Sequence, residues 1–91
     1  MNNNTFVHKY IKPLIHPEDT VVDMTAGNGN DTLFLSRLAR KVIAFDISQT
    51  AIQRCKEKTK GCSNVILYHT GHENVDDYIF QDEASLFLFN L

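Results

Sequence analysis

The chain has 91 residues, a mass of 10.4 kDa and a formal net charge of −2. This length and a composition of 43% hydrophobic and 22% charged residues predict a single globular domain over 1–91, and they exclude a second domain and a disordered or fibrous chain. No apolar run approaches the roughly 18 to 20 residues of a membrane span, and the polar start lacks the features of a signal peptide. We therefore expect a cytoplasmic protein with no membrane partner.

The predicted elements begin with a helix over about 5–15, which Thr5 can cap and Pro17 helps to end. Four apolar residues recur in it at helical spacing and should form its packing side: Phe6, Tyr10, Ile11 and Leu14. A short β-branched run predicts a strand over 20–24. A glycine-rich turn then leads into a second helix over about 31–39.

The second half of the chain continues the alternation of strands and helices. An entirely apolar run favours a strand over 41–47, and Ser48 should cap a helix over about 49–59, with Gly61 as the left-handed residue after it. We expect further strands over 65–69 and 85–91, with a short helix or turn over 75–80 between them. This order indicates an α/β fold with a parallel sheet of about four strands flanked by helices, and ligands bind such sheets at their carboxyl edge.

A candidate site lies where the first two strands end. In the segment Ala26-Gly27-Asn28-Gly29, the two glycines let the backbone approach a ligand closely, and the helix that follows offers free N–H groups to a carboxylate. Asp23 could hold the amides of this loop or meet a ligand ammonium. Asp46 ends the second strand, where an acidic side chain can accept hydrogen bonds from both hydroxyls of a ribose.

The glycine pattern departs from the dinucleotide-binding fingerprint at one position. Thr32 occupies the place of the third glycine, which is wanted where a pyrophosphate sits tightly on the helix. S-adenosylmethionine has no pyrophosphate. The pattern thus favours S-adenosylmethionine, and a nicotinamide-dependent oxidoreductase fragment stays an alternative on the same glycine turn and acidic strand end.

These residues resemble the class I methyltransferases, in which Asp23, Gly27 and Gly29 would form the first motif and Asp46 the acidic residue of the second. The closer resemblance is to the bacterial rRNA methylase-like family, now linked to methylation of the aminomethyl group of the tRNA wobble uridine. It rests on four segments: DTVVD at 19–23, TAGNG at 25–29 with DTLFL at 31–35, AFDI at 44–47 and FNL at 89–91.

The resemblance implies a Rossmann-like fold, S-adenosylmethionine as cofactor and RNA, most simply tRNA, as substrate, with rRNA as an alternative. Further residues are implied at the cofactor: Asn28, Asp31 and Asn90 at its methionine end, Ile47 and Gln49 at its adenosine, and His72 near the adenine. For Asn28 and Asp31, local capping of the helix is the alternative role, and Asn90 could instead contact the target nitrogen.

Members of the family continue beyond this point through several further strands, whereas the sequence stops at Leu91. We therefore expect the cofactor-binding N-terminal half of a longer methyltransferase, with no catalytic residue identified. The alternative is a non-catalytic module that binds cofactor or self-associates. The last strand, Leu86-Phe87-Leu88-Phe89, belongs in a sheet interior, so its exposed edge would favour a homodimer.

The remaining polar residues indicate ordinary structural roles. His69 and His72 lack a third ligand for a metal site, and Cys55 and Cys62 are expected as reduced thiols. Residues 37–60 carry a net charge of +5, while the rest of the chain is acidic. Four cations of this block could approach RNA phosphates, although solvated side chains are the more common case: Arg54, Lys56, Lys58 and Lys60.

Overall fold

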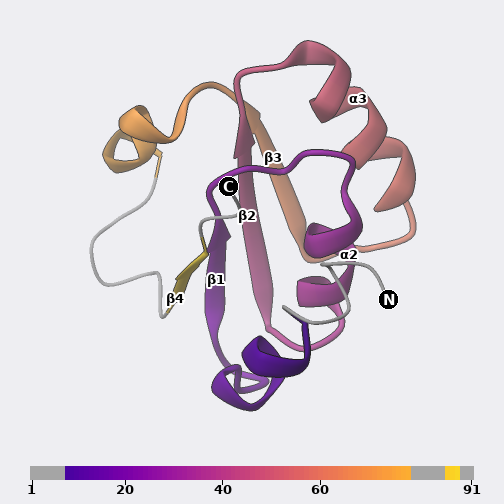
Figure 1. The fold of residues 1–91 in the computed structure, drawn as a ribbon, viewed down its shortest axis with the longest axis vertical. Helices are drawn as coiled ribbons and strands as arrows, with labels where there is room; N and C mark the ends of the chain where they lie inside the picture. The colour runs from indigo at the N-terminus through magenta and orange to yellow at the C-terminus, as the bar shows by residue number, and fades with distance from the viewer. Residues whose placement is uncertain (1–7, 79–85, 89–91) are drawn as a thin grey trace.

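The structure, a computed structural model, describes residues 8–78 and 86–88 and forms a single α/β unit (Figure 1). Its strands make one parallel sheet in the order β3-β2-β1-β4. In chain order the elements are η1 (Lys12–Leu14), β1 (Thr20–Asp23), α2 (Asn30–Ser36), β2 (Lys41–Asp46), α3 (Gln49–Lys58), β3 (Val65–His69), η2 (His72–Asp77) and β4 (Leu86–Leu88). The predicted Rossmann-like sheet of about four strands is confirmed.

The two central strands, β1 and β2, are covered on both faces. All four residues of β1 and the last five of β2 are buried, because apolar side chains point alternately to the two sides of the sheet. Val21 pairs with Val42 and Asp23 with Ala44, so the carboxyl ends of β1 and β2 lie close together. Strand order reverses between β1 and β4, and ligands of open α/β sheets bind at such a point.

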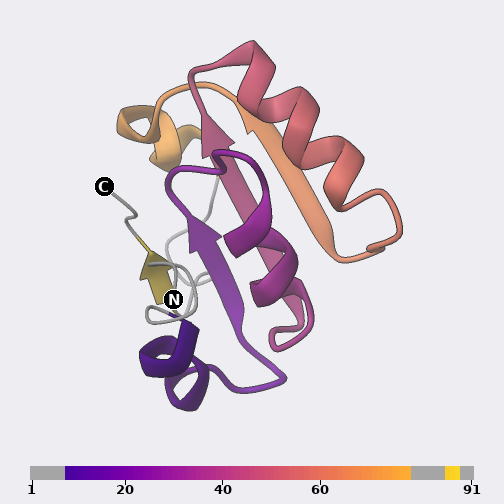
Figure 2. The same cartoon turned by 45° about the vertical axis from the view of Figure 1, so that its right-hand side comes forward.

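Both α2 and α3 pack on the same side of the sheet (Figure 2). Leu35 of α2 packs with Val21 and Val42, and Ile52 of α3 packs with Ala44. The opposite side carries Val22, Met24, Ile43 and Phe45. The Tyr68 ring stacks on Phe45 with centroids 5.4 Å apart, and the Tyr78 ring meets Phe45 edge-on at 5.8 Å. By strand alternation, Asp23 and Asp46 lie on the helix-covered side.

The first helix differs from its prediction in the side that it buries. Residues 8–11 are α-helical and continue into η1, which ends before Pro17. Ile11 and Ile15 face the core, whereas Tyr10 and Leu14 are 64% and 61% exposed. The prediction of these two residues as packing residues is wrong, because the i, i+4 pair of isoleucines is the one that meets α2. Thr5 and Phe6 lie outside the described residues.

The remaining boundaries agree with the sequence within a few residues, and one turn assignment is wrong. Ser48 caps α3 as predicted, with its Oγ accepting a hydrogen bond from the Ala51 amide at 3.2 Å. Gly61 does not adopt a left-handed conformation, since positive φ among the described residues occurs only at Gly27 and Gly29. The C-terminal turn of α3 is held instead by Thr59, whose hydroxyl donates to the Cys55 carbonyl oxygen at 2.8 Å.

β4 is the end strand of the described sheet and pairs with β1 through Leu86, Phe87 and Leu88. This is the position that self-association through a strand edge requires. The homodimer stays a prediction, and light scattering on concentrated protein would contradict it by finding a monodisperse monomer. No helix among the described residues is both long and apolar enough to cross a membrane.

Candidate functional site

The loop between β1 and α2 continues the sheet and then turns tightly. The Ala26 amide donates to the Phe45 carbonyl oxygen at 2.7 Å, and the Gly29 amide donates to the Ala26 carbonyl oxygen at 3.0 Å. Gly27 and Gly29 have φ values of +57° and +91°, a region that glycine enters without steric cost. The loop is thereby fixed against the end of β2, with two of its residues in conformations that favour glycine.

The two glycines serve different physical needs. A Cβ at Gly29 would lie 2.8 Å from Cys55 Cα and 3.3 Å from Cys55 Sγ, so glycine lets the loop pack directly on α3. A Cβ at Gly27 would meet no atom within 4 Å, because open space lies beside this residue. Gly29 is required by packing, whereas Gly27 leaves room for a ligand to approach the backbone.

Asp46 joins the glycine loop to the end of β2. Its Oδ2 accepts from the Gly27 amide and its Oδ1 from the Ser48 amide, both at 2.9 Å. The side chain is largely buried, yet each oxygen has only one of these donors, and a carboxylate oxygen can accept a further hydrogen bond. Asp46 therefore holds the loop in place and keeps acceptor capacity for hydroxyl groups of a ligand.

Asp23 is fully buried beneath the loop. Its Oδ2 accepts from the Thr32 hydroxyl at 2.8 Å and its Oδ1 from the Thr25 amide at 3.2 Å. Burial raises the pKa of Asp23 from 3.8 to about 7, and the hydrogen bonds from Thr32 and Thr25 oppose that rise. The predicted contact with a loop amide is confirmed. Contact with a ligand ammonium stays a prediction.

Thr32 explains the departure from the dinucleotide fingerprint. Its side chain is fully buried and donates the hydrogen bond that Asp23 needs in an otherwise desolvated position. A glycine there would leave this carboxyl with only the Thr25 amide among the described donors. Sequence reasoning identified the absence of a third glycine but missed that the Thr32 hydroxyl donates a hydrogen bond to Asp23.

His8 is a second residue that sequence reasoning did not assign to the site. Its Nε2 lies 2.6 Å from Asp31 Oδ1, and its ring stacks on Phe34 with centroids 3.8 Å apart. Asp31 occupies the first turn of α2 and is 5% exposed. The pair ties the N-terminal helix to the start of α2, beside the glycine loop. Asp31 already has a protein partner in His8, and its contact with the cofactor stays a prediction.

Three further predicted residues lie around the loop. Asn28 is exposed at the tip of the loop, one residue before Gly29, which is the N-cap of α2. Its Oδ1 accepts from the Asn30 backbone amide at 3.1 Å, and its side-chain nitrogen makes no bond to the described residues. Ile47, next to Asp46, is 75% exposed and offers an apolar surface to a flat ligand. Gln49 is the exposed first residue of α3.

Two predicted residues remain, His72 and Asn90. His72 begins η2, with two residues between it and the end of β3, and Asn90 lies outside the described residues. His69 is engaged structurally, with Nε2 2.9 Å from the Ile47 carbonyl oxygen. Within 8–78 and 86–88, no group of three or more His, Cys, Asp or Glu side chains is placed to hold a metal ion.

These residues fit an adenosyl cofactor in three respects. Open space lies beside the Gly27 backbone, spare acceptor capacity lies on Asp46, and an exposed apolar side chain lies next to that acid at Ile47. The amino-acid chain of such a cofactor would approach the loop backbone, its ribose would bind the acid, and its aromatic base would pack on the apolar side chain, in this order along the edge of the sheet. A parallel sheet with such an edge defines the class of Rossmann-like enzymes with nucleoside-containing cofactors.

The comparisons with known proteins narrow this class to one family. The family described as "Putative rRNA methylase" matches residues 42–91, more than half of the chain. The chain belongs to this family, and thus to the class I methyltransferases that use S-adenosylmethionine. It is also 31% identical over 62 residues to an uncharacterized RNA methyltransferase of Chlorobaculum tepidum, a match covering 66% of this chain and 13% of that protein.

Two solved structures share the fold over almost the entire chain. An rRNA methylase of Streptococcus thermophilus is 35% identical with a TM-score of 0.88, covering 100% of this chain and 55% of that one. A methyltransferase of Streptococcus mutans, solved with SAH, is 32% identical with a TM-score of 0.84, covering 96% of this chain and 51% of that one. The chain therefore spans about half the length of these relatives.

Proposed function

We propose that the chain binds S-adenosylmethionine across the carboxyl ends of β1 and β2 and acts as the cofactor-binding half of an RNA methyltransferase. The observation that carries this proposal is Asp46, which fixes the Gly27 amide at 2.9 Å and retains acceptor capacity for the cofactor ribose. The presence of SAH in the related structure of Streptococcus mutans supports the choice of cofactor.

Each side chain of the site has a binding or positioning role in this proposal. Asp46 accepts from the ribose hydroxyls, and Ile47 packs on the adenine with Gln49 and His72 nearby.

At the methionine end of the cofactor, Gly27 and Gly29 bring the loop backbone close, and Asn28 and Asp31 lie beside it. Asp23 and Thr32 keep the loop in shape from beneath, and the cofactor carboxylate lies at the N-terminus of α2.

When bound, S-adenosylmethionine supplies an activated methyl group on a sulfonium centre. The accepting nitrogen lone pair forms a bond to the methyl carbon, the carbon–sulfur bond breaks, and the sulfur keeps its electron pair. The nitrogen then releases a proton to water. Such a displacement depends on alignment of a neutral amine more than on a strong acid or base. Asp23 and Asp46 accordingly act in binding and not as proton carriers.

The acceptor within this proposal is the aminomethyl group of the tRNA wobble uridine, and the related proteins named as rRNA methylases make rRNA the second candidate. Purified protein should be incubated with labelled S-adenosylmethionine in three parallel reactions, with tRNA that carries the aminomethyl group, with matched tRNA that lacks it as the control, and with rRNA. Label in the modified wobble nucleoside supports tRNA. Label in rRNA alone would transfer the proposal to the second acceptor.

Cofactor choice is tested separately by calorimetry with S-adenosylmethionine and with NAD. We expect S-adenosylmethionine to bind with a Kd of about micromolar or weaker and NAD to show no heat of binding. Tight binding of NAD without binding of S-adenosylmethionine would contradict the proposal and favour the oxidoreductase alternative.

A further inference from the structure

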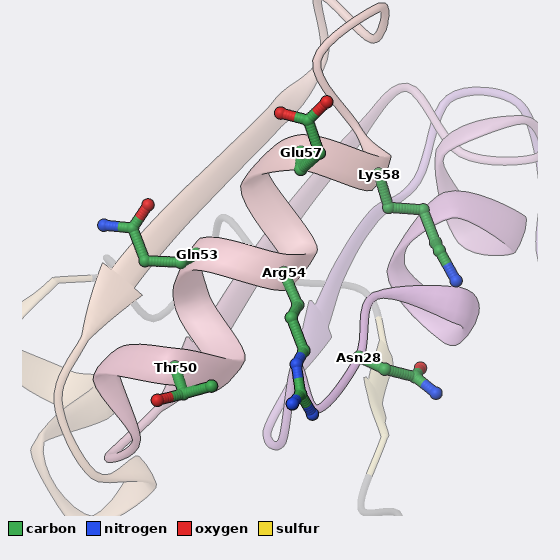
Figure 3. Close-up of a pocket in the computed structure, with 6 residues that line it drawn as sticks. All are labelled: Asn28, Thr50, Gln53, Arg54, Glu57 and Lys58. Atoms are coloured by element: carbon green, nitrogen blue, oxygen red, sulfur yellow. The ribbon is translucent and has the colours of Figure 1, made fainter.

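A shallow depression lies between α3 and the glycine loop and shares one residue, Asn28, with the predicted cofactor site. It is lined by Asn28, Thr50, Gln53, Arg54, Glu57 and Lys58 (Figure 3). Five of these residues come from one side of α3, at spacings of three or four that place them on one helix face. Asn28 closes the depression from the loop, so it adjoins the site described above.

The charges in this depression are arranged asymmetrically. Figure 3 shows the side chains of Arg54 and Lys58 extending toward Asn28, while the Glu57 carboxylate, at the rim of the same depression, points away from Asn28. Glu57 is already paired with Lys60, with Nζ 3.0 Å from Oε1. Two cations therefore face the loop without an acidic side chain between them.

The polar groups around the depression also present donors. Lys58 Nζ donates to Asn30 Oδ1, and Asn28 Oδ1 is occupied by the Asn30 amide at 3.1 Å, which leaves the Asn28 amide nitrogen to donate outward. The guanidinium of Arg54 makes no hydrogen bond or ion pair with the described residues, and its five donors are available. Thr50 adds an exposed hydroxyl.

We propose that this depression binds a backbone phosphate of the RNA substrate through Arg54, Lys58 and the side-chain nitrogen of Asn28. A planar guanidinium and an ammonium beside neutral amide donors suit the oxygens of a phosphate diester, and such contacts position a nucleic acid without reading its sequence. The inference rests on the proposed function, because it supplies the RNA with an anchor next to the cofactor loop.

The surrounding charge supports RNA as the occupant. The segment 49–60, which contains α3, holds Arg54, Lys56, Lys58 and Lys60 against one acidic residue, Glu57, in a chain whose total charge is −2, and such a local excess of cations attracts a polyanion. α3 also offers a matched control, because Lys56 and Lys60 lie in a separate depression against β3, with Val65 and Leu67. One cation pair thus lies beside the loop and the other lies away from it.

The test compares two double variants of equal charge, Arg54→Gln with Lys58→Gln and Lys56→Gln with Lys60→Gln. Binding of an unmodified tRNA transcript is measured by fluorescence anisotropy over a series of KCl concentrations. For the loop-facing pair we expect the slope of log K against log salt to become shallower by about 1, because one phosphate contact is lost, and the affinity to fall about tenfold. The control pair should keep the wild-type slope, and both variants should keep wild-type affinity for S-adenosylmethionine.

Each other outcome overturns the inference in a recognisable way. Equal slopes in the two double variants would refute the anchor while leaving RNA methylation intact. Absence of tRNA binding by the wild type, with S-adenosylmethionine still bound, would overturn the anchor and the RNA substrate together. Binding to phosphatidylglycerol vesicles is measured for the same variants. If the loop-facing double variant loses binding to the vesicles but keeps wild-type binding to tRNA, the depression would be assigned to an anionic lipid surface instead.

Discussion

The glycine loop and the loop-facing side of α3 adjoin each other but differ in burial, in charge and in how their polar groups are satisfied. In the loop, Asp23 and Asp46 are buried and their oxygens are held by backbone amides and the Thr32 hydroxyl at 2.8 to 3.2 Å. On α3, Arg54 is exposed and without a protein partner among the described residues. Preorganised, desolvated groups suit a small cofactor, whereas solvated cations suit a polyanion whose binding depends on salt.

The largest expected effect on stability comes from the glycine that packs against α3. Gly29→Ala forces a side chain into a φ of +91° and within 2.8 Å of the Cys55 backbone, so we expect the free energy of unfolding to fall by about 2–4 kcal/mol. Gly27→Ala is the matched control and should cost about 1 kcal/mol, because its Cβ meets open space.

Urea unfolding of both variants measures this difference, and calorimetry adds a second contrast. Gly27→Ala should weaken S-adenosylmethionine binding although it remains folded, because its methyl group enters the space beside the loop. Equal losses of stability in the two variants, together with an unchanged affinity in Gly27→Ala, would contradict the distinct roles of the two glycines.

Asp23 should make stability depend on pH. Its pKa is raised by burial from 3.8 to about 7, so the folded protein holds a proton that the unfolded chain releases over this interval. The stability from this group is fully present below pH 3.8 and is lost as the pH rises to about 7, with a slope of at most about 1.4 kcal/mol for each pH unit. Asp23→Asn removes this titration. The unfolding free energy of the wild type should therefore fall relative to that of the variant as the pH rises over that range.

A difference that is constant with pH would show that Asp23 titrates at its ordinary value in the folded protein. Denaturant unfolding at several pH values provides the measurement, and subtraction of the variant cancels the contributions of the other carboxyl groups that titrate independently of Asp23.

A smaller effect is expected at Thr32. Thr32→Val keeps the shape of the side chain but removes the hydrogen bond to Asp23 Oδ2, which should cost about 1–2 kcal/mol and raise the pKa of Asp23 further. Thr32→Ser retains the hydroxyl and should keep the pKa close to that of the wild type. NMR titration of the Asp23 carboxyl carbon measures both, and equal pKa values in the two variants would contradict the role of the hydroxyl.

The smallest effect on folding belongs to α3. Arg54→Gln and Lys58→Gln should each change the free energy of unfolding by less than about 0.5 kcal/mol, because both side chains are exposed. Thermal unfolding of the single variants checks this, and a loss comparable to that of Thr32→Val would mean that the α3 cations stabilise the loop as strongly as its buried hydrogen bonds.

The sequence predicted most of the fold because its strands and helices follow local rules. The apolar run Val42-Ile43-Ala44-Phe45 has the pattern of a doubly covered parallel strand, and Ser48 has the position of a helix cap. The first helix was harder, since Tyr10 and Leu14 match the helical period as well as Ile11 does. Only the packing against α2 decides which residues are buried.

The site was predictable where spacing along the chain determines geometry, as for Gly27, Gly29 and Asp46. It was not predictable where distant segments meet. His8 and Asp31 are 23 residues apart and form their pair only because the N-terminal helix lies beside α2. The same holds for Gly29 against Cys55, a contact between the glycine loop and α3 that no local pattern reveals.

The most direct measurement of the central claim is a calorimetric titration of S-adenosylmethionine into wild type, Asp46→Ala and the surface control Glu57→Ala. Asp46 is proposed to bind the ribose and fixes the Gly27 and Ser48 amides, and a hydrogen bond to a charged group is worth about 1.5–3 kcal/mol. The account predicts a loss of affinity of about 100-fold or more in Asp46→Ala and no change in Glu57→Ala. Equal affinity in Asp46→Ala and wild type would contradict it.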